Sequence, residues 1–202
     1  MPNETGVPAL LEEALARFNA LWREAREAAP WEPDAMSLAT ADARGKPSVR
    51  TVLLKEATVR GFVFYTNYES HKGQDLAANP RAALCLFWRS LHRQVIVEGT
   101  VARLTAAESD AYFANRSRRA QLGAWASTQS QPLASRAELD ARLDSLERKH
   151  AGGKVPRPPH WGGFRLAPDL IEFWAPGDGR LNERERYCLG ADGCWTVGLV
   201  NP

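Results

Sequence analysis

Apolar residues near the N-terminus recur at helical spacing. Between Val7 and Glu27 they fall every three or four positions, with charged residues between them: Leu10, Leu11, Ala14, Leu15, Phe18, Leu21 and Trp22. This periodicity predicts an amphipathic helix that packs on the rest of the molecule. Pro30 follows it, and proline cannot continue a helix. We therefore expect residues 1–34 to form an N-terminal helix and a linker.

The pattern changes to alternating and apolar runs at about Ala35. Five such runs follow in order: AMSLAT, SVRTVLLKEA, GFVFYTN, RAALCLFW and RQVIVEGTVARL. Turn residues 44–47 separate the first two runs, and a short helical stretch, Ser70 to Asn79, separates the third from the fourth and stops at Pro80. Strands joined by such short connections pair antiparallel, which favours a barrel over a Rossmann sheet.

Helix-start signals interrupt the strands after the fifth run. Thr105 with Glu108, and Ser135 with Glu138, have the spacing of capping boxes, so we expect two helices within a helical insertion at about residues 105–152. Strand patterns resume with HWGGFRLAPDLIEFW and ERYCLGADGCWTVGLV. The predicted fold class is α+β. Residues 35–202 are expected to form one mainly antiparallel split β-barrel of six to eight strands with peripheral helices.

Composition and charge exclude several classes of protein. The 202 residues are 44% hydrophobic and 25% charged, and 26 cationic residues against 24 acidic ones leave a net charge of +2. This excess is too small for an electrostatic nucleic-acid binder, and no apolar run approaches the roughly 20 residues of a membrane-spanning helix. The sequence has three cysteines, an odd number without Cys-x-x-Cys spacing, and no secretory signal pattern. These features indicate a reducing, cytoplasmic location. The four histidines lack ligand spacing, so we expect no metal site.

The cations are mostly arginines. Only five of the 26 are lysines, which leaves 21 arginines. Such a bias can be a compositional habit of a genome, or it can reflect sites where planar guanidinium groups bind phosphates and carboxylates. The sequence contains no motif typical of phosphate-binding loops, zinc proteases or serine hydrolases. Whether the arginines bind anions must therefore be judged from the residues around each one.

Two contexts suggest anion binding. Tyr65-Thr66-Asn67 ends a predicted strand directly before Ser70-His71-Lys72, which opens a predicted helix. Helix amides, a threonine hydroxyl and cations would form an anion cradle, although a capping serine beside an exposed lysine would give the same pattern. Tyr112 precedes Arg116 on a capped helix, where an arginine could bind a second phosphate or simply face solvent.

An aromatic and cationic surface is a further candidate. Trp174 precedes Arg180 and Arg184, and an indole with guanidinium planes can hold a flat heteroaromatic ring. Tryptophans are also common core residues, and Arg50 and Lys55 can be solvated strand ends. Spacing alone leaves these alternatives open.

Several long segments, taken in order, resemble the pyridoxamine 5′-phosphate oxidase family. They run from about Ala35 to the C-terminal region: RTVLLK, GFVFYTNYESHKG, NPRAALCLFW, RQVIVEG, LGAWASTQS, HWGGFR, and IEFW followed by Arg180-Leu181. The resemblance implies the FMN-binding split-barrel fold. It also implies a homodimer with FMN sites at the subunit interface, a small phosphorylated pyridine as substrate, and molecular oxygen as oxidant.

The resemblance also implies roles for particular residues. FMN contacts are expected from Arg50, Thr51, Val52, Leu53, Leu54, Lys55, Tyr65, Thr66, His71, Lys72, Gln94, Gln129, Ser130, Trp174 and Arg184. Of these, Gln129 and Ser130 are expected to reach the flavin from the partner subunit. Substrate contacts are expected from Lys55, Tyr112, Arg116, Ala120, Arg180 and Asn182. Arg180 is the expected catalytic residue, because it would lie over the pyridine ring and orient C4′ toward flavin N5.

Three positions depart from the family pattern. Asn182 stands where the family usually has histidine, Ala120 where it has serine, and His71 where it has arginine. The implied activity is a pyridoxal 5′-phosphate synthase that oxidises pyridoxamine or pyridoxine 5′-phosphate and reduces oxygen to hydrogen peroxide. The departures keep two alternatives open. One is a flavin oxidase for another flat heteroaromatic substrate, such as a phenazine precursor, and the other is a non-catalytic flavin- or pyridoxal-phosphate-binding protein.

Overall fold

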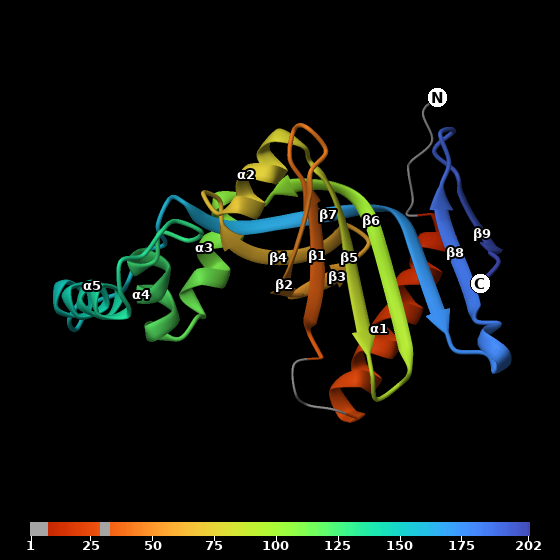
Figure 1. The fold of residues 1–202 in the computed structure, drawn as a ribbon, viewed down its shortest axis with the longest axis horizontal. Helices are drawn as coiled ribbons and strands as arrows, with labels where there is room; N and C mark the ends of the chain where they lie inside the picture. Colours follow the sequence, from red (N-terminus) through yellow and green to blue (C-terminus); the bar gives the residue numbers. More distant parts are fainter. Residues whose placement is uncertain (1–7, 29–32) are drawn as a thin grey trace.

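A nine-stranded antiparallel sheet forms the body of the protein, with helices along one side and at one end (Figure 1). The structure, a computed structural model, describes residues 8–28 and 33–202. Within these ranges the strands are β1 (Ala35–Ala41), β2 (Pro47–Leu53), β3 (Glu56–Thr58), β4 (Gly61–Asn67), β5 (Arg81–Trp88), β6 (Arg93–Arg103), β7 (Trp161–Ala175), β8 (Glu183–Leu189) and β9 (Trp195–Leu199). The helices are α1 (Ala9–Ala28), α2 (His71–Ala78), α3 (Ala106–Ala114), α4 (Arg118–Ala126) and α5 (Arg136–Lys149), with a short 3-10 turn, η1, at Asp178–Arg180.

The strand order explains why the barrel is split. The sheet runs β2-β1-β5-β6-β7-β4-β3, and β8 and β9 extend it from the second half of β7. Its path ends at β2 and β3 without closing, as expected for a split barrel. At Gly99 the β6–β7 register shifts, and a side chain there would meet the Ala167 carbonyl at 2.0 Å. This bulge bends the two long strands at the centre of the sheet.

The expected count of six to eight strands is wrong, because the described residues form nine. The predicted run SVRTVLLKEA is divided into β2 and β3. At the division the Leu54 amide donates to the Asp34 carbonyl, and the Lys55 amide donates to the Val63 carbonyl. The backbone therefore leaves its pairing with β1 and begins pairing with β4 within two residues.

The N-terminal helix packs on the sheet as its apolar spacing predicts. Phe18 is fully buried in α1, and its ring meets Phe62 edge to face at 5.0 Å and lies 5.8 Å from the Trp88 ring. Trp22 donates from its indole nitrogen to the Asp34 carboxylate and fixes the end of the helix near β1. The predicted start at Val7 and stop at Pro30 lie outside the described residues.

The helical insertion contains three helices, so the expectation of two is wrong. Both predicted caps are present: Thr105 and Glu108 form a capping box on α3, and Ser135 accepts from the Glu138 amide on α5. The missed helix is α4, which is capped at Ser117, where the serine hydroxyl accepts from the Ala120 amide. Arg118 then donates to Glu147 at 2.6 Å and to the His150 carbonyl at 2.7 Å, which ties α4 to α5.

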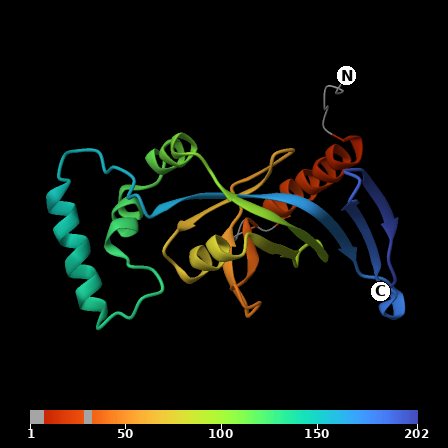
Figure 2. The same cartoon turned by 90° about the horizontal axis from the view of Figure 1, so that it is seen from above.

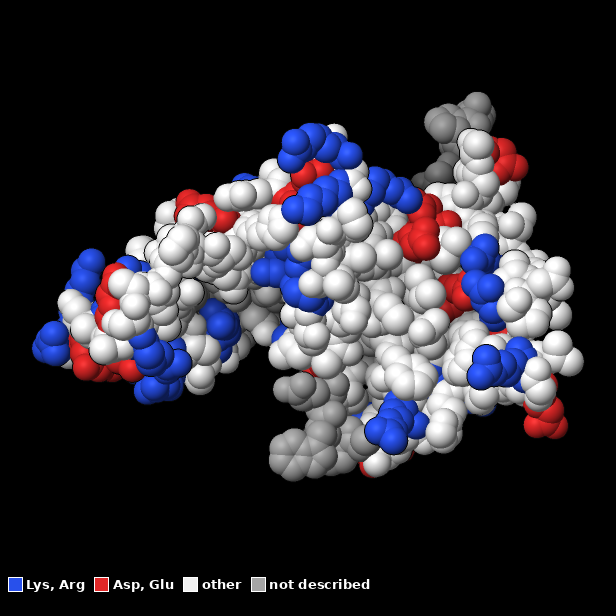
Figure 3. All heavy atoms as spheres, viewed as in Figure 1, with Lys and Arg blue, Asp and Glu red and all other residues white. Residues whose placement is uncertain are grey.

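Figure 2 shows the insertion at one end of an elongated molecule and the β8–β9 hairpin at the other. Positive and negative side chains are interspersed over the face in Figure 3 and form no continuous basic surface there. None of the described helices is long and apolar enough to cross a membrane.

Candidate functional site

A polar cavity of about 320 Å³ lies where β2, β4, α2 and α3 meet. It is lined by Thr51, Val52, Leu53, Lys55, Tyr65, Thr66, Asn67, Lys72, Tyr112, Arg116, Gln129 and Trp161. Ten of these twelve were expected at the site from the sequence. Three are cations, and no Asp or Glu among the described residues lines the cavity. Its electrostatic character therefore suits an anionic ligand.

Lys72 is a buried cation whose partners are all neutral oxygens. Its Nζ donates to Thr66 Oγ1 at 3.2 Å, to Ser70 Oγ at 3.3 Å and to Gln129 Oε1 at 3.1 Å. Burial lowers the pKa of Lys72, and the charge of Arg50 lowers it further. In the described part of the chain no carboxylate forms an ion pair with it. An ammonium group in this setting is stabilised by an anion that enters the cavity.

The first turn of α2 provides the second part of this anion cradle. Ser70 caps the helix by accepting from the Gly73 amide, and the Lys72 ammonium group donates to the same serine oxygen, so it lies at the N-terminal end of α2. A side chain at Gly73 would meet the Tyr68 carbonyl at 2.2 Å, and glycine is therefore required where the helix approaches the preceding loop. Helix amides and a partly positive helix end both favour a phosphate.

Arg50 supports the cradle without lining the cavity. Its guanidinium donates to Thr40 Oγ1 at 2.6 Å and to Ser48 Oγ at 2.7 Å, and it lies 3.7 Å from the Asp75 carboxylate. Thr40 in turn donates to Asp75 at 2.6 Å. Burial lowers the pKa of Arg50, and the nearby negative charge of Asp75 partly offsets this by raising it. The arginine is thus committed to a network beneath α2, and it acts on Lys72 by its charge.

Stacked aromatic rings form another wall. Tyr65 and Tyr112 stack at 3.7 Å with an angle of 8° between their planes, and Trp161 stacks on Tyr65 at 5.5 Å. Burial raises the pKa of Tyr65 to about 12 and also raises the pKa of Tyr112, so both phenols are protonated donors at neutral pH. A flat ligand can lie against such a wall while the hydroxyl groups bind its polar edge.

Arg116 carries an unused donor at this wall. Its guanidinium carbon lies 4.5 Å from the centre of the Trp161 ring, and burial lowers its pKa. Its Nη1 atom is buried and makes no hydrogen bond among the described residues. Leaving such a donor unpaired is costly, so a ligand oxygen that reaches it gains a charge-assisted hydrogen bond.

Gln129 and Ser130 lie against α2 of their own chain. Gln129 contacts Lys72, and the Ser130 hydroxyl accepts from the His71 amide at 3.2 Å. Gln129 therefore lines the cavity of its own chain and Ser130 lies beside it. That both residues reach the flavin from the partner subunit stays a prediction. The exposed His71 ring lies 3.5 Å from the Asp75 carboxylate and does not line the cavity.

A second group of predicted residues lies at the other end of β7. Gln94, Trp174 and Arg184 occupy one row across β6, β7 and β8, since Trp174 pairs in register with both others. Gln94 and Trp174 also line a separate cavity of about 200 Å³. Trp174 lies thirteen residue steps after Trp161 on the same strand, which is roughly 40 Å along β7 at ~3.3 Å per residue. One small ligand cannot touch both ends of this strand in a single chain.

Arg184 is oriented by a buried carboxylate. Glu172 accepts from Arg184 Nε at 2.9 Å and from Arg184 Nη2 at 3.0 Å, and Arg186 also donates to it. Burial acts to raise the pKa of Glu172, but the hydrogen bonds from Arg184 and Arg186 outweigh burial and lower it. This bidentate geometry fixes the plane of the Arg184 guanidinium.

The remaining predicted residues lie away from the cavities. Leu54 is fully buried in the core, and Ala120 lies in the first turn of α4. Arg180 and Asn182 are on the loop between β7 and β8 and line none of the cavities described here.

Sequence reasoning missed Trp161 and Asn67 as lining residues. Trp161 belongs to the quoted HWGGFR segment, and its neighbours Gly162 and Gly163 were a usable signal. A side chain at Gly162 would meet the Tyr68 hydroxyl at 2.0 Å, so this strand lies unusually close to its surroundings.

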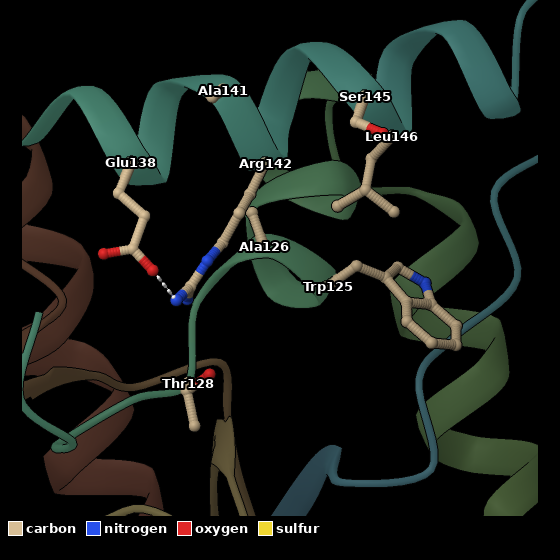
Figure 4. Close-up of a pocket in the computed structure, with 8 residues that line it drawn as sticks. All are labelled: Trp125, Ala126, Thr128, Glu138, Ala141, Arg142, Ser145 and Leu146. Carbon is tan, nitrogen blue, oxygen red and sulfur yellow. Dashed lines mark hydrogen bonds and ion pairs between the residues drawn. The ribbon is translucent and has the colours of Figure 1, made fainter.

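A larger, open cavity of about 710 Å³ lies between α4 and α5 (Figure 4). It contains the Glu138–Arg142 ion pair and the Trp125 side chain, and none of the predicted site residues lines it. Its charges are already paired, so it lacks the unsatisfied donors that distinguish the cavity at Lys72. Among the described residues there is no cluster of three or more potential metal ligands.

These features define a split-barrel protein with a cationic cavity beside an aromatic wall. The family described as pyridoxamine 5′-phosphate oxidase matches residues 21–149, and the family described as the pyridoxine 5′-phosphate oxidase C-terminal dimerisation region matches residues 161–202. The chain belongs to the pyridoxamine 5′-phosphate oxidase family and carries its dimerisation region.

Individual relatives agree with this family. The chain is 53% identical, over 94% of its length and 92% of the relative, to a pyridoxine/pyridoxamine 5′-phosphate oxidase of Myxococcus xanthus. Among solved structures it is similar to PhzG of Burkholderia lata in complex with tetrahydrophenazine-1-carboxylic acid, with a TM-score of 0.86 and 32% identity over 98% and 95% of the two chains. A pyridoxamine 5′-phosphate oxidase-related, FMN-binding protein of Nostoc punctiforme shares the fold, with a TM-score of 0.66 and 18% identity over 98% of each chain.

The ion pair at Glu172 generates a pH-dependent prediction. Its pKa in the folded protein lies below the unfolded value of about 4.3, so the stability that the carboxylate contributes is present above that pH and is lost as pH falls through the folded pKa. Glu172→Gln should lower the free energy of unfolding at pH 7 by about 3 kcal/mol, because two arginines lose their partner.

Denaturant unfolding of both proteins between pH 7 and pH 3 checks this prediction. The difference between wild type and variant should shrink below about pH 4. Glu98→Gln, a change at an exposed position of β6, serves as the control and should stay within ~0.5 kcal/mol of wild type. A difference that is constant with pH would contradict the assigned role of the carboxylate.

Proposed function

We propose that this protein is an FMN-dependent oxidase that converts pyridoxamine 5′-phosphate, pyridoxine 5′-phosphate or both to pyridoxal 5′-phosphate. The observation that carries the proposal is the cavity in which Lys55, Lys72 and Arg116 meet stacked aromatic rings, with no carboxylate from residues 8–28 or 33–202 in its lining. When bound, FMN would accept a hydride from C4′ at flavin N5 and pass both electrons to oxygen, which gives hydrogen peroxide. Water hydrolyses the resulting imine to aldehyde and ammonia when the substrate is the amine.

The chain's own residues fit the FMN phosphate at the cradle. Lys72 supplies a buried positive charge at the N-terminal end of α2, and Thr66 lines the cavity beside it. A phosphate bound there would give Lys72 the anionic partner that its own surroundings lack. Thr51, Val52 and Leu53 on β2 would lie along the flavin, since they line the same cavity.

The substrate phosphate fits the wall at Arg116. Its buried Nη1 donor makes no hydrogen bond among the described residues, and the protonated Tyr112 hydroxyl and Lys55 lie in the same cavity. A guanidinium, a phenol and an ammonium group together can bind a phosphate dianion and hold the pyridine ring at a fixed distance from the flavin.

We propose that a second copy of the chain completes each site. Gln94, Trp174 and Arg184 lie roughly 40 Å along β7 from the cradle, so residues at both strand ends can meet one ligand only if they come from different chains. The matched dimerisation region includes β7, β8 and the loop that carries Arg180. A homodimer with two equivalent sites is the simplest assembly that meets this constraint.

The activity has a direct test. Protein loaded with FMN and mixed with pyridoxamine 5′-phosphate without oxygen should lose the yellow flavin absorbance, because the hydride remains on the flavin. The aldehyde product should be detected by its own absorbance, and readmitted oxygen should restore the yellow colour and release peroxide.

Other outcomes would identify an alternative function. Reduction only by a reduced, carboxylated tricyclic compound of the kind bound by the Burkholderia protein would contradict the proposal and indicate a different substrate. A flavin that no candidate substrate reduces, despite tight ligand binding, would indicate a non-catalytic binding protein.

Two substitutions should separate cofactor binding from catalysis. Lys72→Met should weaken FMN binding at least about tenfold, because a charge-assisted bond to phosphate is lost. Arg180→Ala should leave FMN affinity within about twofold and slow flavin reduction roughly tenfold or more. Flavin titration and stopped-flow reduction measure the two effects, with exposed Lys149→Met on α5 as the control. The reverse order of effects would show that the two roles are wrongly assigned.

A further inference from the structure

The loop between β7 and β8 holds Arg180 in an unusual backbone conformation. Arg180 has a φ of 66° and Gly179 a φ of 61°, so two successive residues are left-handed. Residues with side chains rarely adopt this region, and they remain there only when surrounding contacts enforce it. The side chains of Asp178, Arg180 and Leu181 are all exposed, so packing against other described residues does not hold these three side chains.

Contacts within the loop replace that packing. The Gly177 amide donates to Asn182 Oδ1 at 3.3 Å, and the Leu181 amide donates to the Asp178 carbonyl at 3.1 Å. A side chain at Gly177 would meet the Leu181 carbonyl at 2.0 Å, so the two ends of the loop nearly touch. Asn182, which is half-buried, supplies the side-chain bond that joins these ends.

We propose that Asn182 is a positioning residue that closes this loop and fixes Arg180 in its left-handed conformation. The expected effect on flavin reduction rests on the proposed function. The closure of the loop by Asn182 rests on the loop geometry alone. Asn182 Oδ1 accepts a hydrogen bond from the Gly177 amide, so this oxygen stabilises the closed loop. In the proposed function, Arg180 is the residue of this loop that contacts the substrate. The sequence resemblance assigned Asn182 itself to substrate binding.

The proposal predicts an effect on Arg180 that a general loss of stability would not produce. Without the Asn182 oxygen, the loop samples conformations in which Arg180 points away from the productive position. Flavin reduction then slows in proportion to the fraction of correctly placed Arg180. The cradle at Lys72 is built from β4 and α2, away from this loop, and keeps its FMN affinity.

Two variants of Asn182 test this inference. Asn182→Leu has a similar volume but no acceptor, and Asn182→Asp keeps an oxygen in place. Hydrogen exchange of the Gly177 amide should be roughly five- to tenfold faster in Asn182→Leu than in wild type and close to wild type in Asn182→Asp. This measurement needs no enzymatic activity.

Kinetics test the link to Arg180. Asn182→Leu should slow anaerobic flavin reduction about five- to tenfold with FMN affinity unchanged, and Asn182→Asp should reduce the flavin faster than Asn182→Leu. In an Arg180→Ala background, Asn182→Leu should cause little further slowing, because the residue it positions is gone. A full additional slowing in that background would overturn the proposal.

Two further results would also be decisive. Equal exchange of the Gly177 amide in wild type and Asn182→Leu would overturn loop closure, and fast exchange with a wild-type reduction rate would overturn the positioning role. If wild-type protein fails to reduce flavin with either phosphorylated vitamer, the proposed function fails instead, and the exchange comparison still decides whether Asn182 closes the loop.

Discussion

The buried charge of Lys72 is the constraint on which the rest of the site depends. Its three partners are neutral oxygens from β4, the α2 cap and the segment after α4, so the fold solvates the ammonium group without neutralising it. The Arg50–Thr40–Asp75 network secures α2 from beneath and adds positive charge nearby. No carboxylate among the described residues pairs with the ammonium group, so in the proposed function an anionic ligand would supply the balancing charge.

Strand β7 then determines how the site can be completed. Its first half pairs with β4 beside the cradle, and its second half pairs with β8, which carries Arg184. Because the strand is one continuous, hydrogen-bonded element, its two ends are held apart by its own length. In the proposed homodimer, self-association would bring the proposed cofactor-binding and substrate-orienting residues together, and dimerisation and catalysis would then be linked properties.

Local signals in the sequence predicted much of this structure, and non-local pairings account for the failures. The capping residues Ser70 and Thr105 start helices where expected, since each acts within three residues of itself. Alternating runs predicted most strands. The sequence could not show that Leu54 faces the core or that β2 ends there, because its amide bonds to the distant Asp34.

The candidate site follows the same division. Motif order placed Lys72, Thr66 and Arg116 near a ligand, and the structure brings all three into one cavity. The sequence could not reveal that Gln129 bonds to Lys72 of its own chain, 57 residues away, or that Asn182 bonds to Gly177.

The most direct test of the account is the activity of a purified hybrid dimer of one Lys72→Met chain and one Arg180→Ala chain. If two chains share each site, the hybrid holds one intact site and should recover about half of the wild-type activity per dimer. Activity no higher than the mean of the two single-variant dimers would contradict a shared site.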